Sequence, residues 1–145
     1  MTDDAPEWIS LAKSKLGQHE LAGPSQNNPF IMECFKHTSY SNAPNDETPW
    51  CAAFVCWALE NCDIESTKSA AAKSYLKWGM ELDKPIHGCV VVITRSKDKS
   101  LFHVGFYVGE GLATIDILGG NQADSVSIKK FPKSNVVSYR WPIEE

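Results

Sequence analysis

The second half of the chain constrains the fold most strongly, because it consists of short apolar segments joined by short polar turns. The segments read GCVVVIT, LFHVGFYVGEG, LATIDILGG, SVSIKKF and VVSYRWP, at 88–94, 101–111, 112–120, 125–131 and 136–142. Along the second segment, successive residues fall alternately into two sets, as they do in a strand whose side chains point to opposite faces. The turns between segments are too short for crossover connections, so the sequence predicts an antiparallel sheet of about five strands.

The first half of the chain carries helical patterns. Residues 4–17 are expected to form a helix capped by Asp4 and stopped by Gly17, and residues 28–38 a second helix capped by Asn28. Two further helices are expected at 49–62 and 69–79, the last stopped by Gly79. Helices followed by hairpin-linked strands predict an α+β fold. The length and the 43% hydrophobic content are those of one globular domain, spanning 1–145.

The charge pattern argues against several classes of partner. The formal net charge is -4 and the isoelectric point is near 5.5, so no basic surface is expected for nucleic acid or for an anionic membrane. No apolar run approaches the roughly 18 residues that a spanning helix needs. The start of the chain is acidic, where a secretory signal would be basic. We therefore expect a product made in the cytoplasm that binds neither nucleic acid nor membrane.

The cysteines and histidines do not form a metal-binding pattern. The five cysteines contain no CxxC spacing and the four histidines are scattered, so neither a zinc site nor another cofactor is expected. An odd number of cysteines in a chain of this size is typical of reduced thiols. Cys34, Cys56 and Cys62 fit small buried residues of helices.

Cys51 differs from the other cysteines by its position in the stretch TPWCAAFVCWALE. Thr48 is a good N-cap and Pro49 a favoured first helical residue, which predicts that Cys51 is the third residue of a helix. The unpaired N–H groups and the positive dipole end of a first turn lower the pKa of a thiol, and the thiolate is the nucleophilic form. From its position alone, Cys51 fits a nucleophile and a packing residue equally well.

His103 is the candidate base for such a nucleophile. It shares a strand face with Gly105, whose missing side chain would let a helix backbone approach the sheet. A third polar side chain orients the imidazole in a Cys-His pair, and Asn121 is the candidate, with Asp116 as the rival. Taken singly, His103 also fits an ordinary sheet residue and Asn121 an ordinary turn residue.

Four segments, taken in order, resemble a known superfamily. PWCAAFVCWALENCDI, SAAAKSYLKWG, HVGFYVGEG and ILGGNQADSVSIKKFPKSNVVSYRWP are similar to the papain-like CHAP and NlpC superfamily of cysteine peptidases and amidases, and more narrowly to phage-type and secreted peptidoglycan hydrolases. The resemblance implies a papain-like fold with the nucleophile-bearing helix packed on the sheet. It implies Cys51 as nucleophile, His103 as base and Asn121 as the residue that orients the base. Many relatives have a Glu two residues before that Asn, where this chain has Gly119.

The resemblance also implies a substrate and a biological setting. The activity would be hydrolysis of an amide bond in the peptide part of peptidoglycan, with Trp50 and Tyr107 lining the groove. A bare catalytic module would reach the wall through a phage holin, as an endolysin does, or through a type VI secretion system. The second route implies a small immunity protein that plugs the groove. A monomer is expected. Two alternatives stay open: a protein-directed cysteine peptidase or deamidase, and a noncatalytic peptide-binding module.

Overall fold

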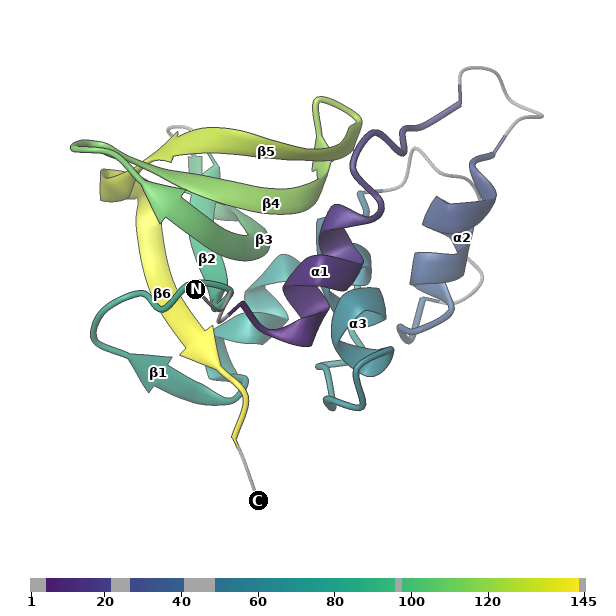
Figure 1. Cartoon of the computed structure of the whole chain (residues 1–145), viewed down its shortest axis with the longest axis horizontal. Helices are drawn as coiled ribbons and strands as arrows, with labels where there is room; N and C mark the ends of the chain where they lie inside the picture. The colour runs from purple at the N-terminus through teal and green to yellow at the C-terminus, as the bar shows by residue number, and fades with distance from the viewer. Residues whose placement is uncertain (1–4, 22–26, 41–48, 96–97, 144–145) are drawn as a thin grey trace.

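The computed structural model describes residues 5–21, 27–40, 49–95 and 98–143. Its helices are α1 (Glu7–Lys13), α2 (Pro29–Phe35), α3 (Cys51–Glu60) and two short 3-10 helices, η1 (Ala72–Lys77) and η2 (Lys133–Asn135). Its strands are β1 (Met80–Leu82), β2 (Val90–Arg95), β3 (Asp98–Glu110), β4 (Thr114–Gln122), β5 (Ser125–Pro132) and β6 (Val136–Trp141). The expected α+β class is confirmed, and Figure 1 shows α1, α2 and α3 gathered beside the sheet. No helix in these described stretches is long and apolar enough to cross a membrane.

The strands form one antiparallel sheet of six strands in the order β1-β6-β2-β3-β4-β5. Strands β2 to β5 follow one another as neighbours, and β6 returns to lie beside β2. The strand that the sequence does not predict is β1, a three-residue edge strand paired with β6. Its residues are all exposed or half-buried, so it lacks the alternation between a buried and an exposed face that marks a strand in sequence.

The two faces of the sheet bury separate apolar clusters. On the face toward the helices, Val104 and Phe106 of β3 belong to a large cluster that includes most of α3. On the opposite face, Tyr107 of β3 packs with Ile115 and Ile117 of β4 in a smaller cluster. We call this face of the sheet, which lies on the side opposite the helices, the inner face. The alternation predicted along residues 101–111 is confirmed, because successive residues of a strand point to opposite faces.

The sequence signals for helix ends hold in part. The Asn28 side chain accepts the N–H groups of Phe30 and Ile31 and so caps α2 as predicted. Helix α1 begins at Glu7, directly after Pro6, while the expected cap Asp4 lies outside the described residues.

The fourth expected helix is only the 3-10 turn η1. The Ser69 hydroxyl accepts the N–H of Ala71 at 3.0 Å, and Ala71 is extended. Such local side-chain bonds compete with helical hydrogen bonds, so the helix cannot begin near Ser69. Gly79 does follow the turn, with a positive φ of 62°.

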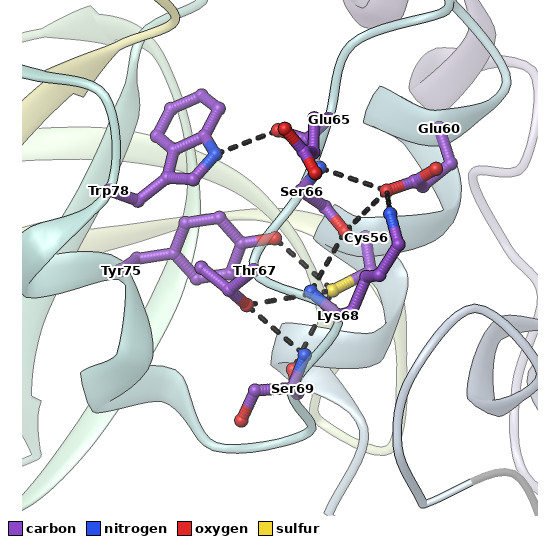
Figure 2. Close-up of polar contacts among 9 residues, drawn as sticks. All are labelled: Cys56, Glu60, Glu65, Ser66, Thr67, Lys68, Ser69, Tyr75 and Trp78. Carbon is purple, nitrogen blue, oxygen red and sulfur yellow. Dashed lines mark hydrogen bonds and ion pairs between the residues drawn. The ribbon is translucent and has the colours of Figure 1, made fainter.

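A polar network ties the segment before β1 to the outer side of α3 (Figure 2). The Cys56 thiol lies 3.2 Å from the Tyr75 hydroxyl inside the core, and the Glu60 carboxylate accepts from the hydroxyl of Ser66 and the ammonium of Lys68, at 2.8 and 2.9 Å. Burial raises the Tyr75 pKa well above its usual value, so this phenol stays a neutral hydrogen-bonding group. The network therefore holds α3 to the segment before β1, and its contact inside the core, between Cys56 and Tyr75, uses a neutral phenol.

Candidate active site

Cys51 is the first residue of α3, not the third. The carbonyl of Trp50 accepts the N–H of Phe54 at 3.0 Å, which makes Trp50 the N-cap residue. Thr48, the expected cap, lies outside the described residues. The shift by two positions leaves the electrostatic argument intact, because the N–H groups of a whole first turn lack partners within the helix. Cys51 still lies at the positive end of α3.

Trp50 is a packing anchor for this helix start rather than a groove residue. Its side chain is 0% exposed, and its indole N–H donates to the Glu20 carboxylate at 2.9 Å. A Cβ atom built on Gly120 would lie 2.5 Å from the Trp50 ring and 2.9 Å from Phe54, so β4 can approach α3 this closely only at a glycine. The close approach between helix and sheet, expected at Gly105, is therefore found at Gly120 instead.

The structure brings Cys51 and His103 together. The His103 side chain lies within electrostatic and hydrogen-bonding reach of the thiol, and both residues are buried, with 8% and 6% exposure. Burial on its own raises the pKa of the Cys51 thiol. The charge and hydrogen bond of His103, with the backbone N–H groups of Val104 and Ala52, outweigh burial and bring the pKa below its usual value. The arrangement favours a thiolate-imidazolium pair.

The two residues meet where strands β3 and β4 separate. The ladder between these strands runs from Glu110 opposite Ile115 to Phe106 opposite Leu118. Beyond Leu118, β4 stays paired with β5, and α3 packs against both β3 and β4. The backbone N–H of Val104 there helps to lower the pKa of the Cys51 thiol. A helix residue thus reaches a histidine that belongs to the inner face of the sheet.

Gln122 fixes the protonation pattern of the imidazole. Its amide nitrogen donates to the carbonyls of Ile117 and Ser127, at 3.1 and 2.8 Å, so its amide oxygen is the atom that faces His103. That oxygen lies 2.8 Å from Nε2 of His103 and can only accept, so Nε2 carries the proton. Nδ1 of the neutral ring is then the basic nitrogen, and it is the one that can take the proton of Cys51.

A β-bulge explains why Gln122, and not Asn121, contacts the imidazole. Gly119 pairs with Ser127 and Gln122 with Ser125, so β4 contains one more residue than β5 over this stretch. The extra residue reverses the alternation and turns Gln122 to the face that Asn121 would occupy in a regular strand. Asn121 takes a positive φ of 59° within the bulge. The paired glycines before Asn121 are the sequence signal for this bulge.

The space beside the imidazole also accounts for the glycine at position 119. A Cβ atom on Gly119 would lie 2.7 Å from the amide oxygen of Gln122 and 3.6 Å from Nε2 of His103. A side chain at position 119 would therefore compete with Gln122 for the same place. Gly119, noted above as a departure from the related pattern, is what the contact between Gln122 and His103 requires.

Asp116 and Tyr107 lie away from the Cys51 thiol. Asp116 pairs with Lys130 at 2.9 Å and stands opposite Gly109, six residues along β3 from His103, or roughly 20 Å of strand. It does not orient the imidazole. The Tyr107 hydroxyl donates to Glu110 at 2.6 Å, and its ring is buried in the inner-face cluster, so the structure does not bring it to the thiol.

Cys34, Cys62 and Cys89 differ from Cys51 in the direction of their pKa shifts. Burial raises the pKa of Cys34 well above its usual value and that of Cys89 to about 11. Burial also raises the pKa of the half-buried Cys62, with the charges of Glu7 and Asp63 adding to it. Within the described residues all five cysteines are unbridged, and no group of three or more His, Cys, Asp or Glu could hold a metal ion.

A large cavity is separate from the Cys51 site. It measures about 960 Å³ and lies beyond the C-terminal end of α3, bordered by Trp8, Cys62, Trp78 and Trp141. Since α3 has ten residues at about 1.5 Å each, roughly 15 Å of helix separate the two places. The cavity takes no part in the thiol chemistry.

Comparison with known proteins adds no family to this geometry. The chain matches no model of a known protein family and no curated protein. A thiol, an imidazole and a carboxamide nevertheless lie together in a buried arrangement, in a chain whose sequence segments resemble cysteine peptidases and amidases.

Proposed function

We propose that this protein is a cysteine hydrolase that cuts an amide bond in the peptide part of peptidoglycan. One observation carries the reaction type: the buried Cys51 thiol lies within reach of an imidazole whose Nε2 is held by Gln122. The ordered resemblance to papain-like peptidoglycan hydrolases carries the substrate class. We also propose, on the same resemblance, that the fold is papain-like.

The first half of the reaction is acyl transfer to Cys51. Nδ1 of His103 takes the thiol proton, and the thiolate attacks the carbonyl carbon of the scissile amide. The backbone N–H of Cys51, at the start of α3, stabilises the oxyanion that forms. The imidazolium then gives its proton to the departing amine, the C–N bond breaks, and the acyl group remains on sulfur.

The second half releases the acyl group. Nδ1 of His103 now accepts a proton from water, the hydroxide attacks the thioester carbonyl, and the thiolate of Cys51 leaves. Gln122 contacts neither substrate nor water in this scheme. It acts through His103, because its hydrogen bond keeps the proton on Nε2 and the basic nitrogen toward the sulfur.

The biological setting is part of the proposal. The protein acts on the wall after passage through a phage holin or a type VI secretion system, and the second route supplies a small immunity protein as partner. Capture of such a partner from the native host distinguishes the two routes.

The test is mass spectrometry of the fragments released from purified peptidoglycan. Wild type, Cys51→Ala and the matched control Cys62→Ala are incubated under reducing conditions. New fragments from wild type and Cys62→Ala, but not from Cys51→Ala, support the proposal, and their masses identify the bond. Unchanged peptidoglycan with folded wild type contradicts it, and cleavage or deamidation within a protein panel would then favour the protein-directed alternative.

A further inference from the structure

One lysine of β5 differs from its neighbours in what it contacts. Lys130 pairs with Asp116 at 2.9 Å and Lys133 with Glu110 at 2.8 Å. Within the described part of the chain, no carboxylate pairs with Lys129, whose ammonium lies instead over the ring of Phe131, 5.7 Å from its centroid. The positive charge of Lys129 therefore rests over an aromatic ring and is not paired with a carboxylate of the described residues.

The register of the sheet places Lys129 on the same face as His103. Lys129 stands opposite Ile117 of the inner-face cluster, whereas Lys130 stands opposite Asp116 on the other face. Residues directly opposite in an antiparallel pair share a face. Phe131, two residues along, contacts the imidazole directly, with ring centroids of His103 and Phe131 5.4 Å apart.

Phe131 thus contacts both the ammonium of Lys129 and the imidazole of His103. The distance from the Lys129 ammonium to the centre of the Phe131 ring and the distance from there to the centre of the His103 ring together come to on the order of 10 Å. This is the length of about three extended peptide residues. The thiolate and imidazolium of the catalytic pair cancel each other in net charge, and the ammonium of Lys129 adds a positive charge near them on the same face of the sheet. Such a cation favours a substrate with negative charge.

We propose that Lys129, supported by Phe131, is a specificity-determining residue that binds a free carboxylate of the peptide substrate within about three residues of the scissile amide. The inference rests on the proposed function and narrows its substrate class. Lys129 takes no part in bond breaking. Because its ammonium is exposed, the contact is partly screened by salt, and its effect is moderate.

The test uses two synthetic wall stem peptides that share the scissile amide and differ in one carboxyl group, free in one and a carboxamide in the other. Wild type is compared with Lys129→Gln and with the matched control Lys130→Gln. The control removes the same charge from the opposite face of the same strand. Both side chains are exposed, so neither change disturbs the core.

We expect Lys129→Gln to raise KM for the carboxylate peptide by about three- to tenfold with kcat unchanged, and to leave the carboxamide peptide unaffected. Lys130→Gln should change neither peptide by more than about twofold. Equal effects of Lys129→Gln on both peptides, or equal effects of the two variants, overturn the inference while leaving the proposed function intact. Wild type that cleaves neither peptide, nor purified peptidoglycan, contradicts the proposed function and this inference with it.

Discussion

The two ends of helix α3 each carry a cysteine, and the two thiols are tuned in opposite directions. Cys51 is the first residue of the helix and Cys62 follows its C-cap, Asn61. The pKa of Cys51 is lowered, because His103 and backbone N–H groups outweigh the effect of burial. The pKa of Cys62 is raised by burial, by Glu7 and by Asp63. One helix therefore provides an internal comparison between a thiol prepared for chemistry and one that is not.

The comparison shows that exposure is a poor guide to reactivity here. Cys62 is more exposed than Cys51, but it lies at the negative end of the helix dipole among carboxylates. Cys51 is nearly enclosed, and the N–H groups and imidazole that surround it stabilise the thiolate. What differs is the sign of the charges that each thiol faces.

The largest effect is expected from removing the Cys51 thiol, with removal of the Cys62 thiol as the control. Cys51→Ala should lower hydrolysis of peptidoglycan by at least about a thousandfold, because the nucleophile is lost. Cys62→Ala should stay within about twofold of wild type, since its thiol takes no part. Rates of fragment release by mass spectrometry measure both. Comparable losses in the two variants would remove the distinction between the ends of α3.

His103→Ala should have the next largest effect. Without the imidazole, burial dominates and the pKa of Cys51 rises, so the thiolate fraction at neutral pH falls. Hydrolysis should drop by roughly 10²- to 10⁴-fold. Alkylation of Cys51 at pH 7, followed by peptide mass spectrometry, should slow while Cys62 is unaffected. An unchanged alkylation rate at Cys51 would show that His103 does not activate the thiol.

Gln122→Ala tests the partner of the imidazole against the residue that the sequence favours. Loss of the hydrogen bond to Nε2 should cost about 10- to 100-fold in kcat and shift its pH profile, with KM little changed. Asn121→Gly is the matched control, because glycine keeps the positive φ of the bulge. A larger loss in Asn121→Gly than in Gln122→Ala would restore Asn121 as the orienting residue.

Gly120→Ala should weaken the packing that holds the start of α3. The added Cβ meets the Trp50 ring, so we expect a loss of about 1–3 kcal/mol in the free energy of unfolding. Gly111→Ala is the control, because its nearest neighbour is 3.6 Å away, and it should change stability by less than about 0.5 kcal/mol. Denaturant unfolding measures both. Equal stability in the two variants would contradict the close packing at Gly120.

The smallest effect is expected at the other end of the helix. Glu7→Gln removes one of the two charges that raise the pKa of Cys62, so alkylation of Cys62 at pH 8 should quicken by about twofold. Glu33→Gln, which changes charge beside the buried Cys34, is the control and should leave Cys62 unchanged. A slower reaction of Cys62 in Glu7→Gln would contradict the sign of this effect.

Local sequence signals were enough to find two of the three residues of the candidate site, Cys51 and His103. Cys51 follows from an apolar helix that begins near Pro49, and His103 from alternation along β3, and both signals span only a few residues. Gln122 was missed because its direction depends on how β4 pairs with β5 across the bulge. The burial of Trp50 depends on the glycine opposite it in β4, which no local pattern around Trp50 reveals.

The most direct test of this account is the pH dependence of alkylation at each cysteine, measured with iodoacetamide and peptide mass spectrometry on the folded wild type. A lowered pKa keeps a thiol reactive as pH falls, and a raised pKa delays reaction until pH rises. The account predicts that Cys51 titrates below the ordinary thiol value of 9.0 and Cys62 above it. Equal titration of the two, or Cys62 titrating first, would contradict it.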